Sequence, residues 1–292
     1  MTFLLIFLAA LVGGTNTPLV KLNVSIFPPA LVAFLRFFIA FLIILPLFFS
    51  KKKKFKKPTI NLLVINSLFA GNILIFVYAV SKTSIIAAQV LYLLASVFVA
   101  LFGYLILREK LTRIQIIGLS IAISGLLVLI ASAATTNDIK STGSLVGNLL
   151  TFIAVIDWSL YVVFSRKLSR QFSPLEITVY NFGMTALLSL IFLLPALKYN
   201  LTFLNNLALA DISSVLAMAF LSTVVFFFLY QWIVKHTSAF ISTMVNYLAT
   251  AFAAIAGIIF FHESLTFYLF VGIVLIVFGA YLSAVKNFKL LS

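Results

Sequence analysis

Asp157 is the one acidic side chain that lies deep inside an apolar run of this sequence. It stands about ten residues into the run 148–165, hence roughly 14 Å deep if that run is a helix that crosses a membrane. Trp158 adjoins it, and Tyr161 follows one helical turn later on the same face. Inserting such an acid costs about 2.5–3.5 kcal/mol, which argues for a role. The position predicts binding of a cationic or amino group, or transfer of a proton; a hydrogen-bonded packing residue is the alternative.

Two matched stripes of polar side chains predict the lining of a binding site. Each stripe spaces its residues at i, i+3 and i+7, which places them on one face of a helix. The members are Gln89, Tyr92 and Ser96 in the first stripe and, 154 residues later, Thr243, Asn246 and Thr250, with Tyr247 beside them. Polar side chains within membrane helices face protein or water rather than lipid. Either stripe alone would more often join two helices, whereas their matched placement favours a central site.

Three further polar residues interrupt apolar runs and are candidates for the same site. Asn16 lies in the segment 13–18, whose Gly, Thr and Pro residues predict a broken helix that frees backbone groups for a ligand. Asn72 lies midway along the run 60–80. Arg36 is suited to attract a substrate carboxylate, although its long stem could equally reach the outer membrane interface.

The elements that must position these residues are apolar segments of membrane-spanning length. Apolar residues make up 64% of the 292 and charged residues 9%, against roughly 45–50% and 25% in soluble domains. Ten segments of the chain meet the requirement of about 17–25 mostly apolar residues per span. They are 3–20, 30–49, 60–80, 84–107, 114–133, 148–165, 175–196, 211–234, 239–261 and 266–285. The sequence therefore predicts an all-α integral membrane protein with ten transmembrane helices.

The basic residues sort to one side of such a protein. The net charge is +14, but the Lys and Arg residues lie in the gaps between apolar runs, which argues against nucleic acid as a partner. With the N-terminus in the cytoplasm, the inside loops hold fifteen of them, whereas the outside loops hold Lys21, Lys82, Lys140 and Lys198. This bias predicts that both termini are cytoplasmic. The Lys, Asn, Ile and Phe content indicates an AT-rich prokaryotic genome, so the plasma (inner) membrane is the expected location.

The sequence also repeats itself with an offset of 154 residues. Gly103, Glu109, Leu111, Thr112, Gly118 and Gly125 return as Gly257, Glu263, Leu265, Thr266, Gly272 and Gly279. Each half, 1–134 and 135–292, then holds five spans, and because five is odd the second half enters the membrane inverted. The expected architecture is two inverted five-helix repeats with a central site between them.

Most residues of this repeat predict structural contacts. The last two glycines of each half are seven residues apart, so they share a helix face and let another helix approach closely. Thr112, followed by Gln115, predicts a capped helix start. Glu109 and Glu263 lie in turns where a carboxylate favours a helix N-terminus.

The repeated turn resembles that of a known family. It reads Glu109-Lys110-Leu111-Thr112 in the first half and Glu263-Ser264-Leu265-Thr266 in the second, and the segments 28–37 and 173–180 resemble the second-helix entries of the two units. Such units are similar to the EamA unit of the drug/metabolite transporter superfamily. The resemblance implies a ten-helix carrier of small metabolites, often an exporter, with its cavity between the halves. Ser96 and Thr250 stand where family members often carry Pro, so no helix kink is assumed there.

These observations favour a secondary transporter that exports small metabolites such as amino acids by alternating access. A proton-coupled antiporter of cationic drugs or polyamines, with Asp157 as its proton site, is the alternative, and a membrane-embedded enzyme or sensor is a third class. His236 and His262 belong to no cluster with metal-ligand spacing, and no phosphate-binding loop occurs, so no enzyme activity, metal, cofactor or ATP-binding partner is expected. The expected partners are a small-molecule substrate and the lipid bilayer, with the chain a monomer or a homodimer.

Overall fold

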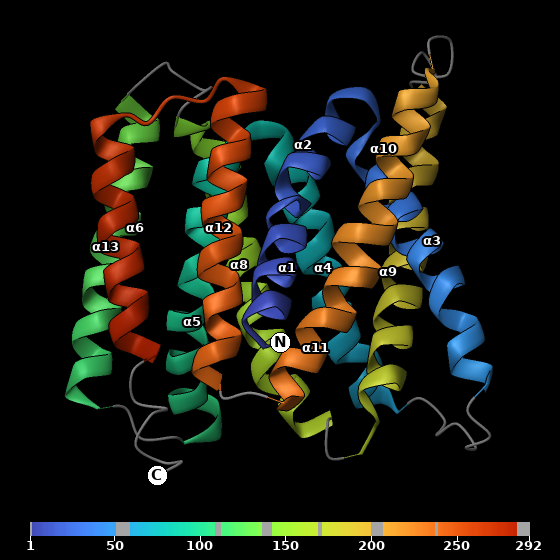
Figure 1. Ribbon diagram of the computed structural model, residues 1–292, viewed down its shortest axis with the longest axis horizontal. Coiled ribbons are helices and arrows are strands. Elements are labelled where there is room, and N and C mark those ends of the chain that lie inside the picture. Colours follow the sequence, from blue (N-terminus) through green and yellow to red (C-terminus); the bar gives the residue numbers. More distant parts are fainter. Residues whose placement is uncertain are drawn as a thin grey trace.

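The computed structural model describes residues 2–50, 59–108, 112–135, 142–168, 171–199, 207–236 and 239–284. Its helices are α1 (Thr2–Gly14), α2 (Asn16–Ile26), α3 (Pro29–Ser50), α4 (Ile60–Lys82), α5 (Ile85–Leu107), α6 (Arg113–Thr135), α8 (Leu145–Leu168), α9 (Pro174–Tyr199), α10 (Leu209–Ala219), η2 (Phe220–Val225), α11 (Phe226–His236), α12 (Ala239–Phe261) and α13 (Phe267–Ala284). They form a bundle in which α1 begins and α13 finishes at the same end, the lower end of Figure 1.

The bundle has the composition of a membrane domain. Within the described chain, eight helical segments are long and apolar enough to cross a membrane, and two shorter apolar helices, Val245–Phe261 and Phe267–Leu282, follow them. These segments are helical because lipid offers no partner for a backbone N–H or C=O, so each must be satisfied inside the chain. Large apolar side chains such as Phe260 and Phe278 lie exposed on the outside, as contact with lipid requires.

The first span is broken, as the segment 13–18 predicts. α1 ends at Gly14 and α2 begins at Asn16, with Thr15 between them. Because the helix resumes after the break, the span extends to Ile26, beyond the predicted end at residue 20.

A second irregularity, which the sequence does not predict, interrupts the span that begins with α10. After α10 the chain forms the π-helix η2 and then continues as α11. π-helices are short insertions within α-helices and are frequent at functional sites.

The repeated turns cap the helices that follow them. The Thr112 N–H donates to Gln115 Oε1 (3.0 Å) at the start of α6, which confirms the predicted cap. At the equivalent position before α13, Thr266 Oγ1 accepts from the Leu269 N–H (3.3 Å). Glu109, the acidic residue of the first turn, lies outside the described residues.

α6 and α13 approach each other closely, as the spaced glycines predict. A Cβ at Gly279 would lie 2.5 Å from both the Ala122 nitrogen and the Gly118 oxygen, and one at Gly125 would lie 3.0 Å from the Gly272 oxygen. These neighbours are backbone atoms, which cannot move aside as a side chain can. We call this contact the glycine seam; it joins one helix of the first half of the chain to one of the second.

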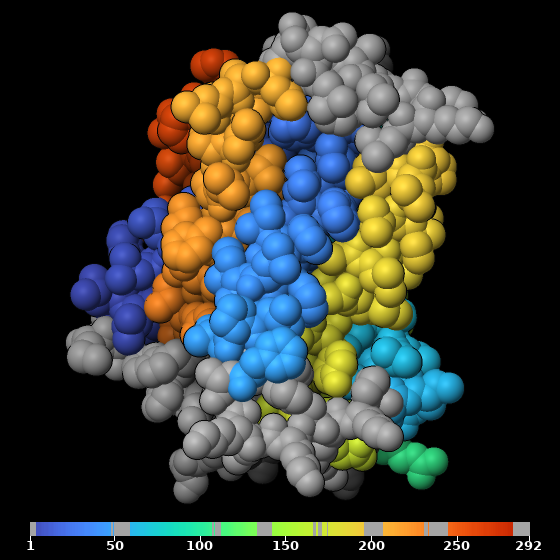
Figure 2. Space-filling view, turned by 90° about the vertical axis from the view of Figure 1, so that its right-hand side faces the viewer, coloured from blue at the N-terminus to red at the C-terminus, as the bar shows by residue number. Residues whose placement is uncertain are grey.

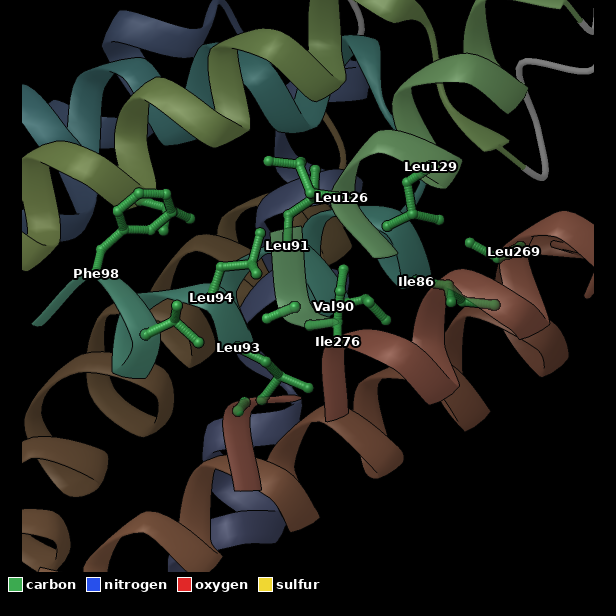
Figure 3. Packing of buried hydrophobic residues seen from close by; sticks show 14 residues of the cluster. Ile86, Val90, Leu91, Leu93, Leu94, Phe98, Leu126, Leu129, Leu269 and Ile276 are labelled. Atoms are coloured by element: carbon green, nitrogen blue, oxygen red, sulfur yellow. The ribbon is translucent and has the colours of Figure 1, made fainter. Parts of the chain in front are cut away.

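Two of the buried apolar clusters of the bundle contain side chains of α8. In the first, shown in Figure 3, Leu91 and Leu94 of α5 pack with Leu126 of α6 and Ile276 of α13. The cluster thus contains side chains from both halves of the chain.

The second cluster, which we call the aromatic cluster, lies between α3, α4, α8 and α9 and has Phe37, Phe69 and Phe182 fully buried. On the face of the molecule in Figure 2, α3 (blue) lies between α10–α11 (orange) and α9 (yellow). α3 therefore passes beside the π-helix, a position that matters for Arg36 below.

Gly279→Val is expected to lower the apparent melting temperature of the detergent-solubilised protein, because the new side chain must displace the backbone of α6. Overpacking of this kind costs about 1–3 kcal/mol. Ser124→Val, on the exposed side of α6 and next to the glycine seam, adds similar volume and is the control. Equal melting temperatures for the two variants would contradict the close contact.

Candidate functional site

Asp157 projects from α8 toward α4, where Gly71 leaves room for its side chain. A Cβ at Gly71 would lie 2.8 Å from Asp157 Oδ2, so the glycine is needed for this placement. The carboxylate is partly exposed, and within the described residues no hydrogen bond or ion pair engages it. An acidic group inside a membrane span is costly without a partner. Asp157 is therefore available to a cationic group or to a proton.

Asn72 and Tyr92 form a hydrogen-bonded pair beside this carboxylate. The Asn72 amide donates to the Tyr92 hydroxyl (2.7 Å) and to the Ala154 carbonyl (2.6 Å), which ties α4 to α5 and to α8. The Tyr92 hydroxyl also lies near the charges of Asp157 and Arg36. One phenol thus lies within range of two opposite charges.

Arg36 is buried, with 3% of its surface exposed. Its Nε donates to Thr223 Oγ1 (2.7 Å) and its Nη2 to the Ser222 carbonyl (3.3 Å), both in η2. The guanidinium carbon also stands 5.1 Å from the centre of the Phe37 ring. The expectation that the stem reaches the outer interface is wrong, because these partners hold the guanidinium inside the protein. Nη1 has no hydrogen-bond partner among the described residues, so it can donate a hydrogen bond to an anionic ligand.

The π-helix explains how this arginine is held. The Thr223 hydroxyl donates to the Met218 carbonyl, five residues earlier (3.2 Å), which orients its oxygen as an acceptor for Arg36. Ser222 Oγ lies 3.2 Å from Thr15 Oγ, at the break between α1 and α2. The break in the first span therefore contacts the π-helix at Ser222, the residue whose carbonyl binds Arg36. Sequence reasoning misses Ser222 and Thr223, whose one signal is an adjacent Ser-Thr pair inside an apolar run.

Trp158 and Tyr161, which follow Asp157 within one turn of α8, pack their rings on Phe69. The Phe69 ring centre lies 6.0 Å from that of Trp158 and 5.2 Å from that of Tyr161. The Tyr161 hydroxyl accepts a hydrogen bond from the Asn181 amide (2.6 Å), which fixes the ring against α9. Aromatic faces beside a carboxylate are suited to a cationic group, because the ring quadrupole attracts positive charge.

The remaining candidates on the first span and on α5 differ in their hydrogen-bond partners. Gln89 donates to Thr17 Oγ1 of α2 (2.7 Å), so it joins two helices. The Ser96 hydroxyl donates to a carbonyl of its own helix, that of Leu93 (2.9 Å). Asn16 Oδ1 is buried and has no partner among the described residues.

Only part of the polar stripe on α12 lies near the polar stripe on α5. The Thr243 side chain lies outside the described residues. Asn246 is exposed and interacts with the Tyr230 hydroxyl, while Thr250 donates to the Asn246 carbonyl of its own helix (2.9 Å). Tyr247 turns its hydroxyl toward Ser96 without reaching hydrogen-bond geometry. Within the described residues, the two stripes meet at this one pair.

The sequence profile of the EamA-like transporter family matches residues 1–131 and 145–285, nearly the whole chain. The chain belongs to the EamA-like transporter family. The resemblance of its repeated turns is thereby confirmed, and the chain is a multi-pass membrane transporter rather than an enzyme.

Curated relatives of this EamA-like protein are named as transporters or efflux pumps. An uncharacterized transporter of Bacillus subtilis (strain 168) is 26% identical over 287 residues, which cover 96% of this chain and 85% of that protein. Two proteins named "probable amino-acid metabolite efflux pump", from Salmonella typhimurium (strain LT2) and Escherichia coli (strain K12), are 25% and 24% identical, and each match covers 94% of this chain and 92% of the relative.

A solved crystal structure shares the fold of the EamA-like chain. It superposes with a TM-score of 0.67 and 19% sequence identity, over 100% of this chain and 99% of the other. At this identity the likeness concerns the fold alone.

A hydrophobic carbodiimide is expected to modify Asp157 in membranes, because this carboxyl is partly exposed and has no partner among the described residues. Mass spectrometry should locate the adduct on the peptide that contains Asp157, and Asp157→Asn should abolish it. Gly71→Ala should slow the modification several-fold, since the added methyl group displaces Oδ2. Labelling of Glu263 in preference to Asp157 would contradict the assignment of the free carboxylate.

Proposed function

We propose that this EamA-like transporter exports small zwitterionic metabolites, such as amino acids, across the plasma membrane by alternating access. In this proposal ten spans form two inverted five-helix repeats, residues 1–134 and 135–292. The substrate lies between them, with its carboxylate at Arg36 and its amino group at Asp157.

Two features support the inverted repeats. Arg108 and His262, separated by the repeat offset of 154, end α5 and α12 in the same left-handed conformation, with φ of 58° and 54°. They are the residues other than glycine with positive φ in the described part of the chain. The glycine seam pairs α6 with α13, the fifth helix of one half with the fifth of the other, as a two-fold axis in the membrane plane requires.

The observation that carries the proposal is the pair of incompletely bound charges. Among the described residues, the Asp157 carboxylate and Arg36 Nη1 have no hydrogen-bond partner, and Tyr92 lies near both charges. A zwitterion supplies the two opposite groups that these side chains lack, whereas an amine or a simple acid supplies one. The aromatic faces of Trp158 and Tyr161 suit the remainder of such a molecule.

The other polar candidates are proposed to line the path to these charges. They are Asn16, Asn72, Gln89, Ser96, Thr243, Asn246, Tyr247 and Thr250. In an alternating-access cycle, the hydrogen bonds of Asn72, Gln89, Ser96 and Thr250 would be exchanged for bonds to water or substrate as one side opens.

The names of the relatives and the charge pattern support the direction and the location. Two relatives are named as amino-acid metabolite efflux pumps, which favours export of amino acids. The helices that flank the Lys-rich segment 51–57, α3 and α4, have their connected ends at the lower end of Figure 1, where α1 also begins. Cytoplasmic placement of that end agrees with the positive-inside rule.

A counterflow screen in proteoliposomes tests the substrate class. Vesicles that contain only this protein are loaded with pooled amino acids, sugars or amines, and exchange of labelled solute is measured. We expect exchange with amino acids. Asp157→Asn and Arg36→Gln should each lower it about 10- to 100-fold, the effect of losing a charged hydrogen bond worth about 1.5–3 kcal/mol.

Thr151→Val is the matched control, because Thr151 is buried in α8 and donates to the Gly147 carbonyl of its own helix (2.8 Å). It should exchange amino acids at the rate of the unchanged protein. Exchange of amines alone, or amino-acid exchange that survives Arg36→Gln, would overturn the zwitterion proposal.

The free carboxylate of Asp157 also favours a second candidate, a proton-coupled antiporter of cationic drugs or polyamines. In vesicles made acid inside, efflux of protons should then drive cation uptake, and Asp157→Asn should abolish the dependence on the pH gradient. Unchanged pH dependence in that variant would exclude Asp157 as the proton site.

A further inference from the structure

The turn between α4 and α5, residues 82–84, is bound by three other parts of the chain. It lies at the upper end of Figure 1, opposite the end at which α1 begins. The Lys21 ammonium of α2 donates to the Val80 carbonyl (2.9 Å) and the Thr83 carbonyl (2.5 Å). From the start of α8, the Ser144 hydroxyl donates to the Lys82 carbonyl (2.7 Å).

The third contact comes from Glu263, in the turn between α12 and α13. Its carboxylate oxygens accept the N–H groups of Ile85 (2.6 Å) and Ile86 (3.0 Å). These donors belong to the first turn of α5, where N–H groups have no partner within the helix. The positive end of the helix dipole also stabilises the negative carboxylate. The expectation that Glu263 serves a helix N-terminus is confirmed, and the helix belongs to the other half of the chain.

The turn that carries Glu263 is shaped to present this carboxylate. The Glu263 N–H donates to the Gly257 carbonyl (3.1 Å), after the left-handed residue His262. A Cβ at Gly257 would lie 2.8 Å from Glu263 Oε2, so only glycine leaves room for it. Burial raises the pKa of Glu263 above its ordinary value, and the two N–H groups and the charge of Lys21 offset part of that rise. These neighbours therefore favour the charged form of the carboxylate.

We propose that Glu263 is a releasable latch that holds the extracellular side of the transport path closed in this structure. The proposal rests on the transport function and orientation given above. Glu263 and α5 belong to different halves, so any rocking motion that parts the two turns must break both hydrogen bonds. Because the contact lies between helix ends rather than inside an apolar span, water can solvate the carboxylate and the N–H groups after they part. Breaking the contact is therefore reversible.

Glu176 provides a matched comparison. It also binds the start of a helix, since its Oε2 accepts from the Ser173 N–H (2.7 Å) and hydroxyl (2.8 Å). That contact lies within three residues of one chain segment, so a motion between the halves leaves it intact. Neutralising Glu176 should alter local helix stability without changing which side of the protein is open.

Cysteine accessibility tests the latch, because the natural chain has no Cys. Ser96→Cys introduces one thiol, eleven residues beyond Ile85 in α5 and hence roughly 16 Å along the helix from the latch. Membranes of known sidedness are treated with a charged, membrane-impermeant thiol reagent. Glu263→Gln should raise the labelling rate from the extracellular face about tenfold, a shift of about 1.4 kcal/mol, and should lower it from the cytoplasmic face. Glu263→Asp, which keeps the charge, should show a smaller change, and Glu176→Gln none.

Lys21→Gln is the second variant if Glu263→Gln fails to fold, since it removes the positive charge that favours the charged form of Glu263 and should shift labelling in the same direction. Unchanged labelling in both variants, or an equal rise from both faces, would overturn the latch. The measurement needs no substrate. A shift in labelling without amino-acid counterflow would refute the proposed function and support the latch. Amino-acid counterflow without a shift in labelling would support the proposed function and refute the latch.

Discussion

A polar group inside a bilayer has no water to bind, and this constraint arranges the interior of this EamA-like transporter. Many buried hydroxyl groups satisfy it locally, as those of Thr151 and Thr185 do by donating to a carbonyl of their own helix. Asn72 satisfies it between helices and so fixes three of them together. Among the described residues, the carboxylate of Asp157 and Nη1 of Arg36 are two of the groups that this internal pairing leaves without a partner.

Features that depend on local pattern could be predicted from the sequence. The break after Gly14, the cap at Thr112 and the glycine seam each follow from a few residues at fixed spacing, and the place of Asp157 midway along α8 follows from counting along an apolar run. Contacts between distant segments could not be predicted. The partners of Arg36 and Glu263 are a π-helix and the start of a helix in the other half, and neither has a signature near the residue it binds.

The two polar stripes show why a sequence repeat alone does not define a site. An offset of 154 residues aligns Tyr92 with Asn246, but equivalence along the chain does not require equivalent neighbours. Tyr92 receives a hydrogen bond from Asn72 and lies near two charges, whereas Asn246 is exposed and interacts with Tyr230. A transporter that occupies one conformation at a time must break the symmetry of its halves, so such differences between matched residues are expected.

The π-helix changes the direction in which the side chains of the following helix, α11, point. The Phe226 N–H bonds to the Leu221 carbonyl, five residues earlier, so the ladder of hydrogen bonds gains one residue within η2. Each later side chain is thereby rotated by roughly 100° about the helix axis, the angle of one residue in an α-helix. Phe227 owes to this rotation its place against Phe69 and Phe182. One surplus residue thus sets both the carbonyl that meets Arg36 and the ring that α11 turns into the aromatic cluster.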